Sequence, residues 1–452
     1  MPAIITQNLR FHNSEQFYEA FTEPANTLIY VFIAKSSPWN NNLDSVGTVA
    51  NQIDNPELSY KLYDEMIAMK RVLSTDVEYV IPRYDWVSGT VYNYYDHTSN
   101  TLFNNEITTR VGISGAVQRA LQPFYVLDTT TFNVYKCLAN SKGAPSTVRP
   151  AGSSANVITM GDGYQWKYMY NIPAGKRSRF LNSDFMYVTD NNYSSNIDGA
   201  LDVIVVTNTG SGYTSAPNVV ITGDGTGATA NVTLLGNTVS NVNIVSRGSG
   251  YRYANVLFSG GGGSNASARV LIGPKGGHAA NARLELGGFF ILLAPLLINE
   301  ESGIFPVDND FRVLGLIKDP HEYGTTSVAS GSTYSTRKNL YLANVTGAFT
   351  LDEFISGGNS KANAVVTSIS ADVGNAKANI KYYQASGVTA NANLFSTGDI
   401  VTGLSSGAAG NLLSITNEGI QPDSGQILYV DSFRPIQRAI DQTESLQLVI
   451  EF

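Results

Sequence analysis

The side chains that most often carry out chemistry are few in this sequence and are not grouped. The four histidines, His12, His97, His278 and His321, lie far apart and lack the His-x-x-Glu-His type of spacing that binds a metal. Each is therefore expected at the surface or in a turn. No Gly-x-Ser-x-Gly elbow and no matched nucleophile and base stand out. The sequence predicts no catalytic, metal or cofactor site, so we expect a protein that is not an enzyme.

The segment from Gly223 to Gly227 (GDGTG) invites comparison with a phosphate-binding loop or a calcium loop. It lacks the Lys-Ser/Thr pair of a P-loop, and no helix is predicted after it. It also lacks the regularly spaced acidic ligands of a calcium loop. We expect a hairpin turn.

Charge and cysteine content exclude further classes. The formal net charge is −8, and the one basic cluster is Lys176 to Arg179 (KRSR), whereas a nucleic-acid-binding face needs many clustered Lys and Arg side chains. We expect this cluster to form a solvated turn or to contact an acidic protein surface. The single cysteine, Cys137, excludes an intrachain disulfide and a cysteine zinc site. It lies in an apolar strand pattern and is expected to be buried and unreactive.

No segment is expected to enter a membrane. The amino terminus (MPAIITQNLRF) lacks the basic-then-apolar pattern of a signal peptide. The longest apolar run, Gly287 to Ile298, contains Pro295 and is too short to span a bilayer. It is expected to form a buried strand pair or a bend. The sequence thus predicts a soluble protein made in a reducing cytoplasm, with neither nucleic acid nor membrane as a partner.

The elements expected to position these side chains are mostly strands. Charged residues make up only 15% of the 452 residues, while Gly (42) and Tyr (25) are abundant. Short Val, Ile and Tyr runs alternate with Gly, Asn, Ser and Thr, which is typical of strands joined by tight turns. The clearest helix is expected after Asn55, which can cap it. Its apolar stripe would contain Leu58, Leu62, Met66 and Met69.

Two internal repeats interrupt this pattern. Gly210 to Tyr213 (GSGY) recurs 38 residues later as Gly248 to Tyr251, and further Gly and Ala positions match at the same offset. Each copy reads as strand, GSGY turn, strand, Gly-rich turn, strand. The copies are expected to pack on each other as an inserted module whose removal leaves the main fold intact. A second pair matches residues 349–369 with residues 395–415 at an offset of 46, again with alternating apolar faces.

The segment from Ser424 to Phe452 predicts a closing strand and carries a family resemblance. Apolar residues at 446, 448 and 450 alternate with residues 447, 449 and 451, which is the period of a half-buried strand. Arg434-Pro435-Ile436 and the polar turn Asp441-Gln442-Thr443-Glu444 precede it. The segment resembles the carboxyl end of the baseplate wedge subunit of T-even-type contractile-tailed bacteriophages, where a Y…RPPI…DQTE stretch runs into an apolar strand.

Further segments resemble the same family in the same order along the chain. They are Thr27–Asn40 (TLIYVFIAKSSPWN), Val80–Trp86 (VIPRYDW), Val134–Leu138 (VYKCL), Asp162–Tyr170 (DGYQWKYMY) and Asn309–Pro320 (NDFRVLGLIKDP). Between these segments the match is poor, and the two repeat regions have no counterpart in the family pattern. The repeats are similar to decoration modules of phage structural proteins.

The resemblance implies a mainly β, two-domain, β-sandwich-like protein with a few helices and two inserted β-repeat modules. The expected division is an amino-terminal β-rich domain (1–198), the first inserted module (199–273), the first part of a second domain (274–338), the second inserted module (339–417) and a closing segment (418–452). The resemblance also implies a structural subunit of the tail baseplate in the virion. Such a subunit forms a homodimer and joins other wedge subunits.

Residues within the matching segments are the candidates for structural or interface roles. They are Trp39, Arg83, Trp86, Trp166, Arg312, Arg434, Asp441 and Gln442. The abundant Tyr fits large protein interfaces, because Tyr buries a ring and keeps a hydroxyl for hydrogen bonding. The alternative is a receptor-binding or glycan-binding tail protein, in which the three Trp side chains would line a sugar groove.

Overall fold

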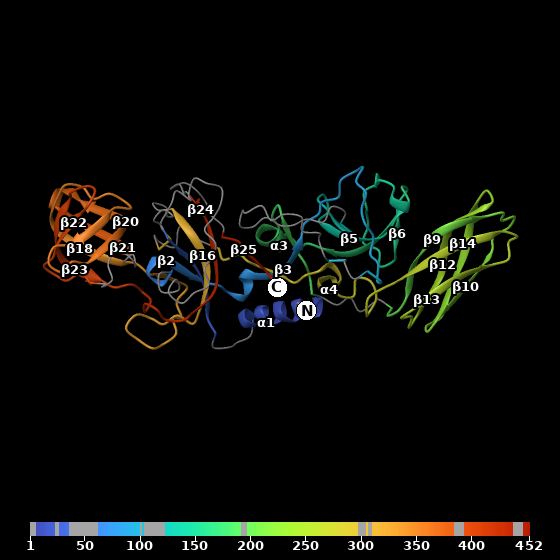
Figure 1. Ribbon diagram of the computed structural model, residues 1–452, viewed down its shortest axis with the longest axis horizontal. Helices are drawn as coiled ribbons and strands as arrows, with labels where there is room; N and C mark the ends of the chain where they lie inside the picture. Colours follow the sequence, from blue (N-terminus) through green and yellow to red (C-terminus); the bar gives the residue numbers. More distant parts are fainter. Residues whose placement is uncertain are drawn as a thin grey trace, which may run out of the picture.

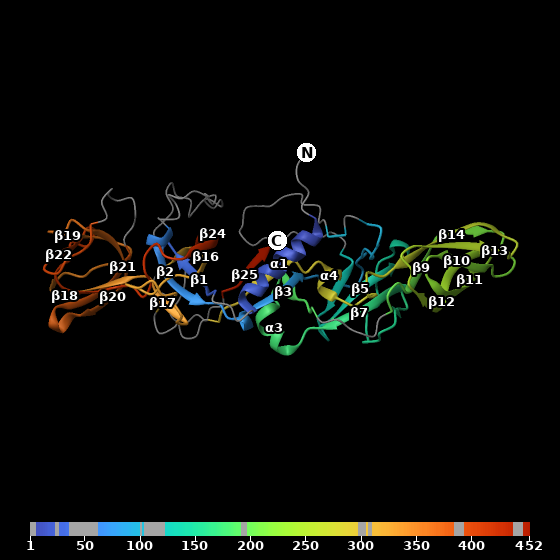
Figure 2. The ribbon, with the colours of Figure 1, turned by 90° about the horizontal axis from the view of Figure 1, so that it is seen from below.

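The computed structural model describes residues 6–22, 27–35, 62–99, 102–103, 123–190, 197–296, 304–305, 310–383, 393–436 and 446–452. The fold is mainly β, as the composition predicts. The longer helical segments of the described residues are α1 (Gln7–Thr22), α3 (Ala174–Phe180) and α4 (Ala282–Leu286). Figures 1 and 2 show an elongated molecule with one repeat region at each end and the remaining sheets between them.

Three antiparallel sheets form the central body. The first has the order β17 (Thr333–Ser335), β2 (Met66–Arg71), β1 (Ile29–Ala34), β16 (Phe311–Lys318) and β24 (Gln426–Ile436). The second has the order β25 (Leu448–Glu451), β15 (Phe290–Leu293), β3 (Val77–Pro82) and β8 (Phe185–Tyr187). The third has the order β4 (Tyr125–Asp128), β5 (Asn133–Asn140), β7 (Tyr164–Asn171) and β6 (Ile158–Thr159). The first two sheets therefore join strands from before residue 198 with strands from after residue 274.

A main hydrophobic core runs through this body, with smaller apolar clusters beside it. Strand β1 (IYVFIA) is buried on both faces. Ile29, Val31 and Ile33 enter the main core shared with the other two sheets, while Tyr30 and Phe32 enter a separate cluster on the opposite face. A strand with both faces covered reads as a continuous apolar run instead of an alternation. The segments assigned by sequence to two domains thus share sheets and a core.

The prediction of a helix after Asn55 is wrong from Met66 onward. Met66 and Met69 lie in β2, which is hydrogen-bonded to β1 on one side and to β17 on the other. Helical structure is present at residues 62–65, and residues 55–61 lie outside the described residues. A short run of four buried residues is compatible with the apolar stripe of a helix and with a strand that is buried on both faces. Here hydrogen bonding to β1 selects the strand.

The predicted closing strand is confirmed. Strand β25 pairs with β15, and Leu448 is buried in the main core. Leu446 and Ile450 are half-buried against the same core. The apolar run expected as a buried strand or bend contributes β15, whose four residues are all buried. The turn at residues 441–444 lies outside the described residues.

The first repeat region has the same order of elements in both copies. The first copy contains β9 (Leu201–Ser211), β10 (Asn218–Gly223) and β11 (Thr226–Leu235), and the second contains β12 (Thr238–Ser249), β13 (Ala254–Ser259) and β14 (Ser264–Ile272). β9 pairs with β14, β10 with β13 and β11 with β12, so these three ladders all cross between the copies. The copies are therefore interleaved, and each depends on the other for its backbone hydrogen bonds.

A tyrosine from each copy lies on a glycine of the other. Tyr213 and Tyr251 are buried, and a methyl group added at Gly263 or Gly225 would overlap the ring of Tyr213 or Tyr251, respectively. Both pairs are related by the 38-residue offset. The repeated glycines are thus required because they leave room for an aromatic ring. The segment from Gly223 to Gly227 joins β10 to β11, which lie in different sheets, so it is a bend between sheets instead of the expected hairpin.

The second repeat region is a closed barrel with the order β18, β21, β20, β19, β22 and β23. These strands are β18 (Lys338–Thr346), β19 (Phe354–Gly357), β20 (Asn363–Asp372), β21 (Lys377–Tyr383), β22 (Ile400–Gly403) and β23 (Ala409–Thr416). The barrel has its own apolar interior, which includes Ile355, Val401, Phe349 and Phe395. Closure leaves no free edge strand that could pair with another chain.

The copies of the barrel repeat are joined through two buried carboxylates, Glu353 and Asp399, which are equivalent at the 46-residue offset. Each accepts hydrogen bonds from a backbone amide of its own copy and from a turn of the other copy. For Asp399 the donors are the amides of Ser396 (3.1 Å), Asn359 (2.9 Å) and Ser360 (3.0 Å). For Glu353 they are the amides of Thr350 (2.6 Å), Ser405 (3.3 Å) and Ser406 (3.0 Å).

Candidate interaction surfaces

Arg83 is engaged within its own chain. Its guanidinium donates two hydrogen bonds to Asp85, at 2.8 and 3.0 Å, and a third to the carbonyl of Asn182 at 2.7 Å. A bidentate arginine–carboxylate pair holds both side chains in one geometry. Arg83 therefore orients the loop after β3 toward the segment before β8.

The two described tryptophans belong to one aromatic cluster on the outer face of the β4–β7 sheet. Trp166 is completely buried and stacks on Tyr164, with ring centroids 5.6 Å apart. Trp86 packs half-buried against the same cluster and donates its indole N–H to Ser146 Oγ at 3.1 Å. Arg149 lies over the Trp86 ring at 5.3 Å. Trp166 therefore has no surface to offer a sugar or a partner, while part of Trp86 stays accessible.

The remaining candidates are not gathered into one site. Arg312 is buried on β16, 3.6 Å from Asp310, and Arg434 is exposed on the neighbouring strand β24. Trp39, Asp441 and Gln442 lie outside the described residues. The structure thus separates the described candidates into a group near the β4–β7 sheet and a pair at the β16–β24 ladder.

Of the two arrangements expected for the basic cluster, the structure shows contact with acidic residues instead of a solvated turn, and these residues belong to the same chain. The cluster lies in α3, and its side chains bind groups of the same chain. Lys176 pairs with Glu78, and Arg177 donates to the carbonyl of Ile172 at 2.7 Å. Arg179 donates to Asp76 at 2.5 Å and to the carbonyl of Ala294 at 2.6 Å. A solvated turn is not formed because the helix covers the ends of β3 and β15, whose carboxylates and carbonyls need donors.

The expectation for His278 is also wrong, because this side chain is completely buried. Neither ring nitrogen has a hydrogen-bond partner among the described residues, and the ring packs edge-on against Tyr95. Burial, with the nearby Lys136 next in size, holds the pKa of His278 well below its ordinary value. His278 is thus a neutral residue of the interior, whereas His12 and His97 are exposed as expected.

A buried group of charges surrounds His278 where the first repeat region meets the body. Lys136 on β5 pairs with Glu285 on α4, and both side chains are almost fully buried. Glu285 also accepts the backbone amide of Ala279 at 3.0 Å. The Lys136 ammonium lies 4.7 Å from the centre of the Tyr95 ring. Burial lowers the pKa of Lys136, and the Glu285 carboxylate opposes that change.

The repeat region contributes its own charges to this junction. Asp202 on β9 pairs with Arg247 on β12, and burial raises the pKa of Asp202 while Arg247 opposes the rise. Arg269 on β14 pairs with Asp96 and donates to the Tyr94 hydroxyl at 2.9 Å. Val203 and Leu271, from the first and last strands of the region, lie in the main core of the body. The base of the first repeat region is therefore built into the body.

The sequence contained a signal for this junction that composition alone does not give. At the 38-residue offset Asp202 corresponds to Ser240, Arg247 to Thr209 and Arg269 to Asn231. The charged residues at the base are thus places where the two copies differ. Of these departures from the repeat, Arg269 binds Asp96 of the body, whereas Asp202 and Arg247 pair with each other at the base of the region.

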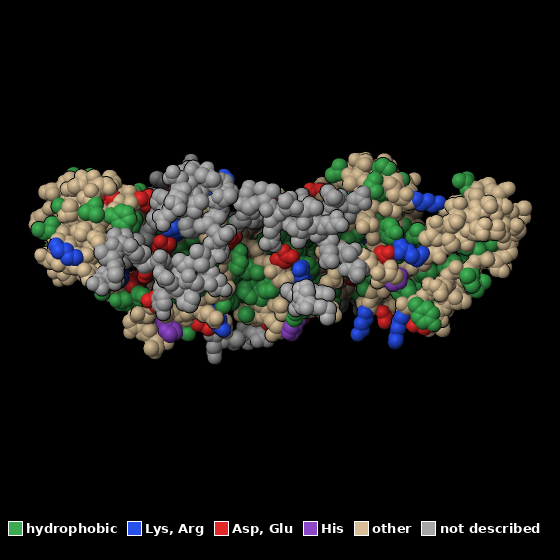
Figure 3. Space-filling model, viewed as in Figure 1, with side chains coloured by type: hydrophobic (Ala, Val, Ile, Leu, Met, Phe, Trp, Pro, Cys, Tyr) green, Lys and Arg blue, Asp and Glu red, His purple; other side chains and the backbone are tan. Residues whose placement is uncertain are grey.

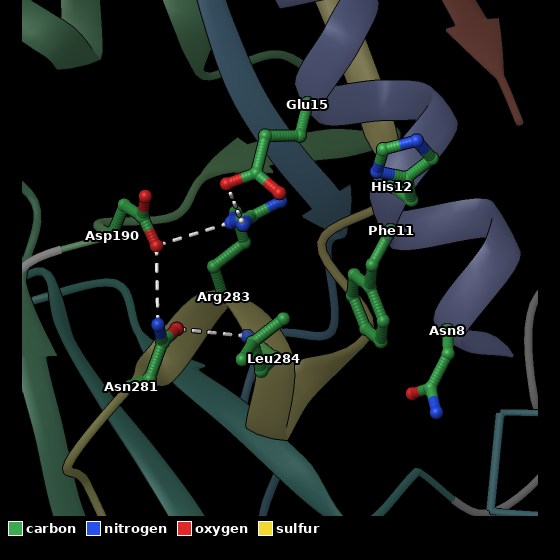
Figure 4. Close-up of a pocket in the computed structure, with 8 residues that line it drawn as sticks. All are labelled: Asn8, Phe11, His12, Glu15, Asp190, Asn281, Arg283 and Leu284. Carbon is green, nitrogen blue, oxygen red and sulfur yellow. Dashed lines mark hydrogen bonds and ion pairs between the residues drawn. The ribbon is translucent and has the colours of Figure 1, made fainter.

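An open pocket of about 410 Å³ lies between α1 and α4, with Arg283 in its wall. Figure 4 shows Arg283 between Asp190 and Glu15, and the distances are 3.1 and 3.5 Å. Arg283 also lies 4.4 Å from the centre of the Tyr79 ring. Arg283 is already paired with two carboxylates, and one of them, Glu15, lies on α1. We therefore interpret this ion pair as a structural contact that holds α1 on the body. The sequence analysis missed this residue.

The described residues offer no site of several other kinds. They contain no group of three or more His, Cys, Asp and Glu side chains placed to hold a metal ion. Among the described helices, none is long and apolar enough to cross a membrane. Cys137 is buried as expected, and burial raises the pKa of its thiol well above the ordinary value.

Large apolar side chains are exposed at both ends of the molecule (Figure 3). In the first repeat region the most exposed are Leu235 and Val245, and in the barrel they include Ile400 and Leu404. Exposed apolar side chains mark sites of protein contact where they form a contiguous patch. The apolar ends of this elongated molecule are therefore the candidate surfaces for contact with other proteins.

Comparison with known proteins supports the family resemblance. A family model described as Bacteriophage T4, Gp8 matches residues 3–138. A curated protein named baseplate wedge protein gp8, from Enterobacteria phage T4, is 26% identical over 186 residues. That alignment covers 38% of this chain and 56% of the relative, so the match spans a little over half of the relative's length. These two matches confirm the resemblance to the wedge subunit.

Proposed function

We propose that this chain is a structural subunit of a phage tail baseplate wedge, which joins neighbouring wedge proteins through protein–protein interfaces. The observation that carries the proposal is the match of residues 3–138 to the Gp8 family model. The same segment supplies β1, β2 and β3, which lie at the centre of two body sheets. The resemblance therefore includes the strands on which the body is built.

The proposal extends to the location and chemistry of the protein. A wedge subunit resides in the virion, at the tail baseplate, and performs no catalysis. It contacts other wedge subunits and a second copy of itself, and it needs neither nucleic acid nor membrane. The internal use of Arg83, Lys176 and Arg179 supports this reading, because these cations are paired within the chain. They are therefore not available as a basic face for phosphates.

Imaging of assembled particles tests this function. The chain is labelled with a small tag in the Lys142–Gly143 turn, which is exposed, and intact and contracted virions are examined by electron microscopy. We expect the label on the baseplate, at wedge positions. Label at the tips of tail fibres would contradict the proposal and favour the receptor-binding alternative. No described feature favours that alternative, since Trp166 is buried away from any groove.

A further inference from the structure

Two buried lysines lie side by side where the body meets the first repeat region. Lys136 on β5 and Lys167 on β7 are direct partners in the β5–β7 ladder, so their side chains project from the same face of the sheet. Lys136 is completely buried and Lys167 is 1% exposed. Figure 1 shows β5 on the side of the body that faces the repeat region. Like charges directly opposite each other destabilise a sheet, and burial removes the water that would screen them. This pair needs a compensating negative charge.

The neighbouring carboxylates are already engaged with other groups. Glu285 pairs with Lys136 and also accepts two backbone amides, at 3.0 and 3.2 Å. Asp202 is the carboxylate with the largest effect on Lys167, and it pairs with Arg247. Lys167 also donates to a backbone carbonyl, which carries no net charge. Among the described residues of this junction, three cations thus share two carboxylates.

The side chain of His278 lacks an acceptor in the same place. It is completely buried, and neither ring nitrogen has a hydrogen-bond partner among the described residues. Its ring centroid lies 4.9 Å from that of Tyr95, and the Lys136 ammonium lies 4.7 Å from the centre of the same Tyr95 ring. Lys136 and Lys167 are the charged groups with the largest effect on His278. A neutral imidazole carries one N–H donor, and a buried donor requires an acceptor.

We propose that the junction binds a small inorganic anion, of the size of chloride, between Lys136, Lys167 and His278. An anion accepts hydrogen bonds from both ammonium groups and from the imidazole, and its charge compensates the adjacent lysines. Complete burial of the three side chains favours a monatomic ion over an oxyanion, which would need a larger cavity. The two ammonium groups repel a metal cation from the same place.

The anion contacts parts of the chain that are distant in sequence. Lys136 and Lys167 belong to the body, whereas His278 lies in the segment that leads from β14 of the repeat region to α4. Arg247 on β12 adds a further positive charge near His278. A ligand that binds the assembled junction and not its separated parts stabilises the assembled form by mass action. Docking of the first repeat region on the body therefore depends on the anion concentration.

Hydrogen exchange tests the site in a series of buffers in which chloride replaces gluconate at constant ionic strength. Once chloride exceeds its Kd, each tenfold increase is expected to raise protection in β5, β7 and β12 about tenfold. The barrel has its own core and is the internal control, which should not respond. Protection at the junction that stays constant over the series overturns the proposal. It would indicate that Lys167 is neutral, because burial lowers the pKa of this side chain and a neutral amine needs no anion.

A variant with a matched control separates the site from general effects of salt. Lys167→Met removes one of the two adjacent cations and is expected to abolish the response to chloride, whereas Lys142→Met, at an exposed lysine, keeps it. His278→Phe retains a ring against Tyr95 but loses the N–H donor, so its response should be weaker. Thermal melting of each variant checks that the fold is kept. A Lys167→Met protein that responds as strongly as the unchanged protein contradicts the site.

Crystals of the unchanged protein grown in bromide locate the ion without any variant. We expect an anomalous peak between the Lys136 and Lys167 ammonium groups and the His278 ring. Bromide found at the surface and not at this position is an adventitious ion only, and that result overturns the proposal.

Discussion

The two repeat regions solve the same problem with different chemistry. Each is a duplicated sequence that cannot bury its apolar face alone, and each joins its copies through symmetric contacts. In the first region the contact is Tyr213 on Gly263 and Tyr251 on Gly225, an apolar ring against a bare backbone. In the barrel it is a buried carboxylate that accepts amides from the other copy's turn. The first contact depends on shape, and the second depends on charge and therefore on pH.

The regions also differ in how they are attached. The first is built into the body through Val203, Leu271 and the buried charges around Lys136. The barrel has a separate core. It is attached through Lys338, which pairs with Glu418 at 3.7 Å, and through the buried Arg337, which donates to Thr367 of the barrel at 3.4 Å and to the carbonyl of Ile304 at 3.0 Å. Stability of the first region and of the body should therefore be coupled more strongly than stability of the barrel and of the body.

The largest expected effect comes from breaking the buried pair at the base of the first region. Lys136→Met leaves Glu285 charged and buried without its cation, which is expected to cost about 3–5 kcal/mol of unfolding free energy. The double variant Lys136→Met, Glu285→Gln should recover much of this loss, because no unpaired charge remains. Denaturant unfolding of the three proteins measures both values. Equal loss in the single and double variants would contradict the argument.

Removal of one ring tests the contact between copies of the first region. Tyr251→Ala empties the space over Gly225 and is expected to lower the unfolding free energy by about 3 kcal/mol. Hydrogen exchange should show the loss of protection in β9–β14 and at the base of this region, with the barrel unchanged. Tyr253→Ala, at an exposed tyrosine two residues away, is the matched control and should have little effect. Loss of protection in the barrel would show that the two ends are coupled.

The equivalent change in the barrel is Asp399→Ala. It leaves the amides of Asn359, Ser360 and Ser396 without their acceptor and is expected to cost about 2 kcal/mol. Because the barrel has its own core, protection should fall there while the body keeps its protection. Asn411→Ala, at an exposed polar residue of the same barrel, serves as the control. A global loss of stability would contradict the separate core.

The smallest expected effect is the response of the barrel to acid. Hydrogen bonds from the Ser360 hydroxyl and from backbone amides outweigh burial and lower the pKa of Asp399 to about 2, and the pKa of Glu353 is also lowered. A depressed folded-state pKa stabilises the fold above the ordinary carboxyl pKa and is lost as the pH falls through the lowered value. Barrel stability should therefore decline between about pH 4 and pH 2.

Asp202 at the base of the first region should respond in the opposite direction. Its pKa is raised by burial, so protonation on acidification favours the folded form at that position. Hydrogen exchange, pulsed at a common pH after incubation at different acid values, resolves the two regions. Asp96 at the base of this region and Asp224 within it have lowered pKa values, so the comparison of the unchanged protein with Asp202→Asn isolates the contribution of Asp202. Equal acid responses of these two proteins would contradict that contribution. The variant Asp399→Asn should remove most of the decline in the barrel.

Hydrophobic periodicity and residue composition predicted most strands well. The internal repeat predicted the order of elements in the first repeat region. Glycine spacing predicted a Gly-rich turn in each copy, but it could not reveal that a tyrosine of the other copy packs on Gly225 and on Gly263. The pattern at Met66 and Met69 failed because the partner strands β1 and β17 lie far away in sequence. His278, Lys136 and Glu285 were missed for the same reason, since each finds its surroundings only after distant segments meet.

The pairing of β25 with β15, and of β15 with β3, has a consequence for synthesis. This sheet of the body joins residues near 80 and 290 to residues near 450, so it cannot be completed until residue 451 has left the ribosome. Each repeat region, by contrast, pairs strands that lie within one short stretch of chain. Local pairing is fast and long-range pairing is slow. The repeat regions should therefore fold during translation, while the body between them closes last.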